Sequence, residues 1–315
     1  MKRSGLQGWV AETLLKGSTG CAALLSFGLV FLMLAFLLAY AYPAIVFNGT
    51  AFFTSLKWSI GDQYATGTIV RAGFAGLPGA AFGALVFIAG TMLTSCFAMV
   101  ISVPLSLLVA IALVYRVPAG AQPFANAIVG LMAGVPSVVY GLWGLVVLVP
   151  YIGARFGGSG NGLLAATLLL SLMVIPIMVS AMRDVISQQS TAIYESSMAL
   201  GSTDWQAVTR AVLPSAGSGI GAAVLFAFGR ALGETMAVLM VCGSAINTLP
   251  HSIAQPVNTI AAVIVSQLES ALADPTGMAQ RSLAELALTL FVITLAVNGI
   301  ARLILSGRIR LRGAA

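Results

Sequence analysis

The stretch Met182–Gly243 reads MRDVISQQSTAIYESSMALGSTDWQAVTRAVLPSAGSGIGAAVLFAFGRALGETMAVLMVCG, and the rest of the chain can be interpreted around it. Its first half is a polar, amphipathic segment between two apolar runs. Its second half is an apolar run that carries Arg230 and Glu234 near its middle. A charge at mid-bilayer costs about 2.5–3.5 kcal/mol on insertion scales, so such residues usually face a bundle interior or a wet cavity. The stretch therefore predicts a polar elbow on one membrane face, joined to a charged membrane helix.

The composition places the chain in the membrane. Hydrophobic residues make up 59% of the sequence and charged residues 8%, and the mean hydropathy is +1.01. A soluble domain carries about 25% charged residues, and a membrane β-barrel would show alternating segments of about 10 residues. The three cysteines lie in apolar runs without metal-ligand spacing, so they are interpreted as small core residues. We expect an all-α, multi-pass membrane protein.

Six apolar runs are long enough to cross a bilayer, at about residues 20–46, 81–114, 123–152, 163–182, 216–245 and 283–306. The first is too long for a signal-peptide core of about 7–15 residues, so it is expected to remain as a helix. We expect Pro104 to kink the second run, or that run to tilt and extend past the membrane, and we expect Gly134–Ser137 to interrupt the third. The polar elbow takes residues 183–214, and the loop 246–282 includes a short amphipathic helix near 257–272. Glu285 is expected to cap the sixth helix or line its outer mouth.

The basic residues set the expected orientation, because cytoplasmic loops are enriched in Lys and Arg. With the N-terminus inside, ten basic residues fall on the inner side: Lys2, Arg3, Lys16, Arg116, Arg183, Arg210, Arg302, Arg308, Arg310 and Arg312. Four fall outside: Lys57, Arg71, Arg155 and Arg281. The net charge of +6 is therefore interpreted as a topology signal rather than as a nucleic-acid surface. Both termini and the elbow are expected in the cytoplasm.

The elbow is predicted to hold two short helices with a sharp corner between them. Thr191–Leu200 can form the first, and Gly201 suits a C-terminal cap that needs positive φ. Thr203 then starts the second helix, with Gln206 three residues later in a capping-box arrangement. Arg183 and Asp184 are expected to cap the elbow's start. The spacing alone leaves a second interpretation open, an amphipathic loop that lies on the lipid surface.

The elbow resembles the EAA loop of ABC importer permeases, whose pattern is Glu-Ala-Ala, three residues, Gly, nine residues, Ile, one residue, Leu-Pro. Four residues match at the family's spacing: Glu195, Gly201, Leu213 and Pro214. Ser196 and Ser197 replace the two alanines, and Ala211 replaces the isoleucine.

Other segments resemble the PstC-type permeases of phosphate importers, over about residues 85–315. They are Gly134–Gly144, Met182–Val185, Gly229–Val238 and Leu288–Thr294. The companion PstA-type subunit usually reads closer to Arg-Ala-Ile-Gly-Glu-Thr-Ala-Pro in the fifth span, so Leu232 and Met236-Ala237 favour the PstC type.

The resemblance implies a type I ABC importer permease fold of six transmembrane helices with cytoplasmic coupling helices, in a bacterial inner membrane. It divides the chain into a tail, first helix and periplasmic loop (1–82), a permease core (83–306) and a cytoplasmic tail (307–315). The implied partners are a PstA-type permease, two ATP-binding subunits and a periplasmic phosphate-binding protein. The sequence has no Gly-x4-Gly-Lys-Ser/Thr phosphate loop, so ATP and Mg²⁺ are expected on the partner ATPase and this chain needs no cofactor of its own.

The resemblance also implies roles for particular residues. Contact with the ATPase is expected at Glu195, Gly201, Thr203, Trp205, Leu213 and Pro214. The phosphate pathway is expected at Arg230, Glu234, Thr235, Ser137 and Tyr140. Arg230 offers a planar donor fork to phosphate oxygens, and Glu234, one helical turn on, would keep the empty pathway near neutral. A helix broken at Pro136 would present free N–H groups to an anion, with hydroxyls from Ser137 and Tyr140.

Several alternatives stay open. Arg230 and Glu234 could form a buried pair that only fixes helix packing, and Pro136 could make a plain kink. The chain could be an ABC permease for another oxyanion, such as molybdate or sulfate. It could also be an ion-coupled secondary transporter, although that class often shows inverted repeats and several titratable membrane residues. An added role in signalling phosphate status is compatible with any of the ABC alternatives.

Overall fold

The computed structural model describes the backbone of residues 5–189 and 191–312, and the side chains of residues 14–189 and 192–303. Lys2 and Arg3 lie outside these limits, as does the end of the predicted tail at 313–315. Within the described residues, six helical segments are long and apolar enough to cross a membrane: Leu14–Asn48, Leu85–Tyr115, Ser137–Phe156, Leu163–Ser187, Asp204–Leu232 and Met278–Leu303. The predicted all-α fold with six spans is confirmed.

The described helices are α1 (Gly5–Asn48), α2 (Ala51–Thr54), α3 (Leu85–Tyr115), α4 (Gln122–Gly134), α5 (Ser137–Trp143), α6 (Val149–Phe156), α7 (Leu163–Ser187), α8 (Thr191–Ala199), α9 (Asp204–Ala207), α10 (Leu213–Leu232), α11 (Met236–Val241), α12 (Ile260–Leu272) and α13 (Met278–Arg312). In the same part of the chain, four short strands form two antiparallel pairs: β1 (Trp58–Ser59) with β4 (Ala81–Phe82), and β2 (Ile69–Arg71) with β3 (Phe74–Gly76).

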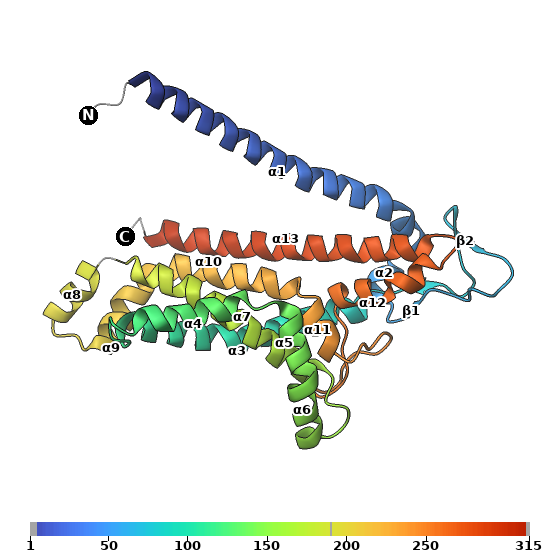
Figure 1. Cartoon of the computed structure of the whole chain (residues 1–315). Helices are drawn as coiled ribbons and strands as arrows, with labels where there is room; N and C mark the ends of the chain where they lie inside the picture. The colour runs from blue at the N-terminus through green and yellow to red at the C-terminus, as the bar shows by residue number, and fades with distance from the viewer. Residues whose placement is uncertain (1–4, 190, 313–315) are drawn as a thin grey trace.

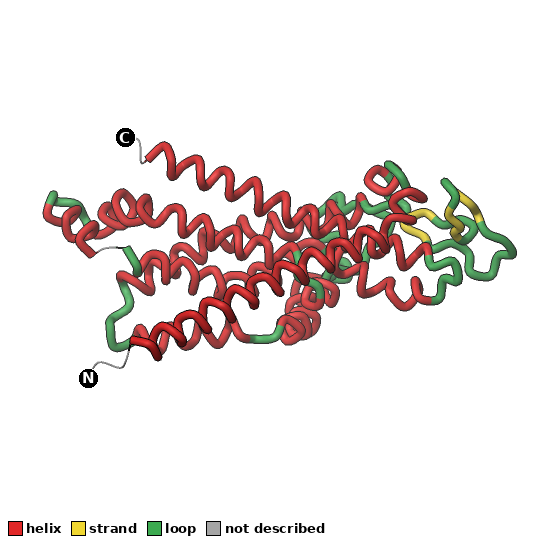
Figure 2. The backbone as a smooth tube through the Cα atoms, turned by 90° about the horizontal axis from the view of Figure 1, so that it is seen from above, coloured by secondary structure: helices red, strands yellow, loops and turns green. Residues whose placement is uncertain are grey.

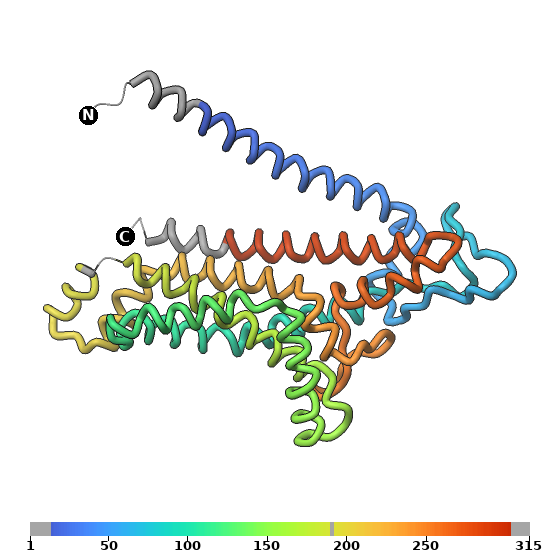
Figure 3. Tube along the Cα trace, viewed as in Figure 1, coloured from blue at the N-terminus to red at the C-terminus, as the bar shows by residue number. Residues whose placement is uncertain are grey.

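The long helices lie roughly along one common axis, some in one direction and some in the other, so the molecule has two distinct ends (Figure 1). One end carries α8 and α9 together with the start of α1 and the last turns of α13. The other end carries the strands, and a view from above shows the same division, with the strands gathered at the end away from both termini (Figure 2). The helix α1 leans away from the bundle toward its start (Figure 3), and its side chains from Leu14 to Leu32 are exposed.

The bundle is built around α7, the most buried of the six spans. It packs along α3, where small hydroxyl residues allow close approach. Ser102 Oγ donates to the Ser171 carbonyl at 3.4 Å, and Ser171 Oγ is 3.3 Å from the Ala98 carbonyl. The helix α3 continues through Pro104 without a break. The kink expected at Pro104 stays a prediction.

A second core lies at the strand end, where the end of α1, the strands, α12 and the start of α13 meet. Asn48 and Glu285 are both buried there, with 8% and 3% exposure. Asn48 Nδ2 donates to Glu285 Oε2 at 2.8 Å and to Ser282 Oγ at 3.3 Å. The expectation that Glu285 caps the sixth helix is wrong, because α13 begins at Met278 and Glu285 lies two turns inside it.

This contact gives a stability prediction. Asn48→Leu removes a donor from the buried Glu285 carboxyl, and an unsatisfied buried polar group costs about 1–3 kcal/mol. We expect the purified complex to lose its fold at a lower temperature. The double variant Asn48→Leu, Glu285→Leu should recover part of that loss, because it removes both polar partners. Strictly additive losses in the two single variants and the double variant would contradict a direct interaction.

Several predicted spans have different limits in the structure. The third is broken at Val135 and Pro136, which are extended between α4 and α5, as the sequence predicted. The fifth begins earlier than expected, because α9, a π-helical segment at Val208–Val212 and α10 form one continuous helical stretch from Asp204. A second π-helical segment, Gly144–Leu148, precedes α6. Each segment stands just before a proline, Pro214 or Pro150, and a wider turn accommodates the ring and the missing N–H.

The fifth span also ends earlier than expected, at Leu232. Gly233, Glu234 and Thr235 separate α10 from α11, and Thr235 Oγ1 donates to the Gly233 carbonyl at 3.2 Å. The loop that follows contains α12, which confirms the short helix predicted near 257–272. The helix α13 continues past residue 306, where the sixth span was expected to end.

Candidate coupling elbow and substrate pathway

The elbow is a helix–turn–helix with a well-defined corner. Gly201 has φ of +85°, in the left-handed region that glycine favours. Its N–H donates to the Met198 carbonyl at 2.9 Å, and the Ser202 N–H donates to the Ser197 carbonyl at 3.3 Å. This pair of bonds is a Schellman cap at the end of α8. The predicted cap at Gly201 is therefore confirmed.

The second helix of the elbow starts with a capping box. The Gln206 N–H donates to Thr203 Oγ1 at 3.4 Å, and the Thr203 N–H donates to Gln206 Oε1 at 3.0 Å. The predicted capping box is confirmed. Ser197 Oγ also donates to Ser202 Oγ at 3.1 Å, so one of the two serines that replace the EAA alanines closes the corner.

The capping box supports a prediction about local order. Thr203→Ala removes the N-cap oxygen, which costs about 0.5–2 kcal/mol, so α9 should fray. Hydrogen exchange at residues 204–207 should become about threefold or more faster in the variant. Thr203→Ser keeps the oxygen and serves as the control. Equal exchange in all three proteins would show that the cap does not hold α9.

An aromatic contact joins the elbow to the bundle, and a hydrogen bond joins the two helices of the elbow. The rings of Tyr115 on α3 and Tyr194 on α8 stack with centroids 5.3 Å apart. The Tyr194 hydroxyl donates to Asp204 Oδ1 at 3.0 Å, and this hydrogen bond raises the pKa of Tyr194. Tyr194 on α8 therefore contacts α3 through its ring and α9 through its hydroxyl.

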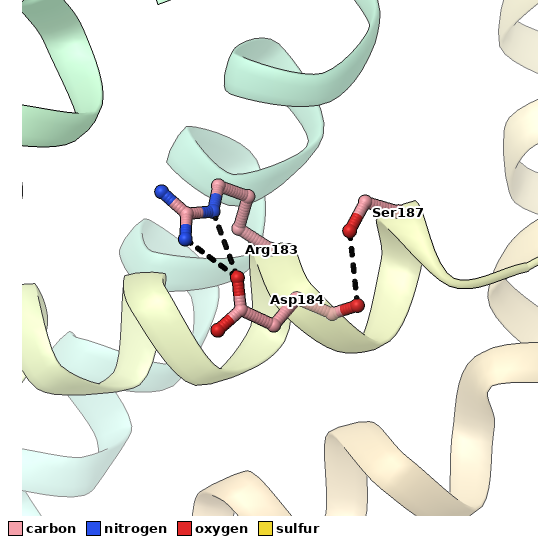
Figure 4. Close-up of polar contacts among 3 residues, drawn as sticks. All are labelled: Arg183, Asp184 and Ser187. Carbon is pink, nitrogen blue, oxygen red and sulfur yellow. Dashed lines mark hydrogen bonds and ion pairs between the residues drawn. The ribbon is translucent and has the colours of Figure 1, made fainter. Parts of the chain in front are cut away.

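The start of the elbow differs from the prediction. Arg183 and Asp184 lie inside the last turns of α7, which runs on to Ser187. Figure 4 shows the Arg183 guanidinium donating to the neighbouring Asp184 carboxylate through two nitrogens, with Nε at 3.1 Å. Ser187 Oγ donates to the Asp184 carbonyl at 3.0 Å. The pair therefore lies on the side of the helix, whose C-cap is Gln188.

The tip of the elbow exposes apolar side chains. Leu200 is 88% exposed and Trp205 is 55% exposed, and Glu195 and Gly201 are exposed beside them. Leu213 and Pro214 are half-buried in the first turn of α10. Of the six predicted coupling residues, the first four in sequence therefore lie on an accessible surface at the end of the molecule.

The predicted pathway residue Arg230 lies in a groove between α10 and α13. The groove has a volume of about 1060 Å³, and its polar wall consists of Arg230, Thr294, Asn298 and Arg302. Arg230 and Glu234 form neither a hydrogen bond nor an ion pair in the described structure. The one-turn spacing predicted for them is wrong, because α10 ends between them at Leu232.

A second hollow of about 420 Å³ adjoins the first, because Gly229 and Thr294 line both. Thr235 lies in this second hollow, with α12 forming the opposite wall. Two of the predicted pathway residues, Arg230 and Thr235, thus line adjoining spaces. Glu234 is half-buried in the break between α10 and α11.

Ser137 and Tyr140 lie elsewhere, on α5 beside α11. Gly141 allows this close packing, since a Cβ there would lie 2.7 Å from Met240 Sδ. The Tyr140 hydroxyl donates to the Met132 carbonyl at 2.9 Å, so it bridges the broken helix instead of pointing a free donor at an anion. The structure does not bring these two residues into the Arg230 groove.

Sequence reasoning gave no pathway role to Thr294, Asn298 and Arg302. Their signal was a four-residue spacing of polar side chains in an otherwise apolar span, which places them on one helix face.

Comparison with known proteins defines the class. The fold resembles a chain of the MetNI methionine ABC transporter, solved in inward-facing conformations, with a TM-score of 0.51 and 20% sequence identity over 70% of this chain and 94% of that one. This is the type I ABC importer permease fold. The chain belongs to the family of binding-protein-dependent transport system inner membrane components, whose family model matches residues 102–310. It is therefore a multi-pass membrane protein of a transport system, and the EAA loop is a feature of that family.

Two relatives indicate the branch of the family. The phosphate transport system permease protein PstC 1 of Mycobacterium bovis is 40% identical over 282 residues, which cover 83% of each chain. The phosphate transport system permease protein PstC of Pasteurella multocida is 35% identical over 71% of this chain and 75% of its own. The resemblance to PstC-type permeases is confirmed.

Proposed function

We propose that this chain is a transmembrane subunit of an ATP-driven importer that moves inorganic phosphate across the bacterial inner membrane. The observation that carries the proposal is the Arg230 guanidinium, which lines the α10–α13 groove and has no acid partner among the described residues. An unpaired guanidinium in a membrane-spanning segment is stabilised by binding an anion, and its planar arrangement of N–H donors suits phosphate oxygens. The PstC relatives named above agree with that choice of anion.

The chain itself supplies no catalysis. It would pair with a PstA-type permease, two ATP-binding subunits that hold ATP and Mg²⁺, and a phosphate-binding protein on the outer face. The exposed elbow tip at Leu200 and Trp205 offers an apolar contact for the ATPase, and the Tyr115–Tyr194 stack would pass its motion to α3. Glu234 would lower the net positive charge near the pathway, so that phosphate binds weakly enough to leave.

The elbow end would lie in the cytoplasm with both termini. The start of α1 and the end of α13 lie at the same end as α8 and α9, which supports a common side for all three (Figure 1). A reporter fused at Trp205 that reads as external would contradict this orientation. The sequence-derived division at residues 82 and 306 stays a prediction.

The proposed substrate is tested by competition. The complex is reconstituted with its binding protein, and phosphate uptake is measured with sulfate or molybdate in excess. We expect neither oxyanion to compete appreciably. If the complex takes up sulfate or molybdate instead of phosphate, that other oxyanion is the substrate and the proposal is wrong.

A further inference from the structure

The helix α13 carries a row of polar side chains that faces α10. Thr294, Asn298 and Arg302 follow one another at intervals of one turn, and all three line the same groove as Arg230. A Cβ at Gly229 would lie 3.5 Å from Asn298 Nδ2, an ordinary contact distance. Asn298 therefore lies close to α10, in the same groove as the predicted pathway arginine.

Arg302 adds a second positive charge to this groove. The groove wall contains Arg230 and Arg302 and no Asp or Glu among the described residues. Arg302 forms no ion pair with any residue whose side chain the structure describes. Two like charges in one membrane groove repel each other. An oxyanion in the groove would relieve this repulsion, because guanidinium groups bind it through charge-assisted hydrogen bonds.

The order of the groove residues gives it a direction. α10 and α13 run in opposite directions, and Arg302 lies one turn beyond Asn298, about 6 Å nearer the elbow end. Thr235 and Thr294 lie on the opposite side, in the adjoining hollow. The second hollow and the groove together form one continuous space. It begins near Thr235, passes Arg230 and Asn298, and ends at Arg302.

We propose that Asn298 and Arg302 form a second oxyanion subsite, which receives phosphate from Arg230 on the elbow side of the pathway. This inference rests on the proposed function and adds two residues and a direction to it. Two adjacent weak sites let an anion leave the first without having to enter apolar surroundings.

The test measures phosphate binding in the groove without relying on transport. Ala222, which lines the groove, is replaced as Ala222→Cys in a Cys21→Ser, Cys96→Ser background, because Cys21 and Cys96 are exposed and Cys242 is buried. The full complex is placed in phosphatidylcholine vesicles with the elbow side outward. A membrane-impermeant maleimide then reports access to the groove at increasing concentrations of inorganic phosphate.

We expect phosphate to slow the labelling. Arg302→Gln should raise the half-protecting concentration about tenfold or more, and Arg302→Lys, which keeps the charge, should raise it less. Arg155→Gln makes the same chemical change on α6, outside the groove, and should have no effect. Protection that is equal in the parent and Arg302→Gln, or absent from both, would overturn the proposal. Protection that appears only with added phosphatidylglycerol would also overturn it, because the ligand would then be a lipid headgroup.

Uptake measured in the same preparations separates this inference from the proposed function. If the parent complex takes up phosphate with ATP and its protection does not depend on Arg302, only the second subsite is wrong. If the parent complex takes up no phosphate, the proposed function itself is wrong.

Discussion

Replacing Arg230 by glutamine should leave a folded complex that hydrolyses ATP but takes up phosphate about 10–150 times more slowly. Arg230 lies in the groove between α10 and α13 without an acid partner in the described structure, so its removal strands no buried carboxylate. A hydrogen bond to a charged group contributes about 1.5–3 kcal/mol, which corresponds to that range of rates. The measurement is initial uptake in reconstituted vesicles, with ATP hydrolysis recorded in parallel.

Two variants control the Arg230 experiment. Arg230→Lys keeps the charge but loses the bidentate fork, so its uptake should be intermediate. Arg155→Gln, at the end of α6, should transport as the parent does. Normal uptake by Arg230→Gln would assign Arg230 to helix packing and exclude it from the pathway.

Replacing Gly201 by valine should break the link between ATP hydrolysis and transport. The left-handed conformation costs about 1–2 kcal/mol for an L-residue, and φ at Gly201 is +85°. A branched side chain is a clear outlier in that region, so the corner between α8 and α9 should rearrange. We expect ATP-driven uptake to fall tenfold or more, with less ATPase subunit co-purifying.

The control for Gly201 is another glycine with equal free space. A Cβ at Gly201 or at Gly217 would meet nothing within 4 Å, but Gly217 is in the helix α10 and does not have positive φ. Gly217→Ala should therefore leave uptake unchanged. If Gly201→Val supports normal coupled uptake, the shape of the corner is not what the ATPase recognises.

The sequence predicted the parts of the fold that depend on local patterns. Hydropathy located the six spans, Pro136 marked the break in the third, and Gly201 and Thr203 marked the corner of the elbow. Pro214 was interpreted as a boundary, yet a π-helical segment carries the helix through it. The break at Gly233 was missed, because a glycine in an apolar run is also common in close helix packing.

The residues that depend on distant contacts were harder to predict. Glu285 accepts a hydrogen bond from Asn48, which lies 237 positions away in the sequence. No local sequence pattern predicts that pair. Arg230 was identified from its charge in an apolar run and from the family resemblance, but the α13 face opposite it was not, because helix pairing cannot be derived from one span. Tyr140 offered a hydroxyl donor, and only the fold shows that this hydroxyl donates its hydrogen bond to the Met132 carbonyl.

The most direct test of the account is phosphate uptake by the purified complex in vesicles, with and without ATP on the elbow side. We predict uptake that requires both ATP and the external binding protein. Equal uptake with and without ATP would contradict the account and indicate an ion-coupled transporter instead.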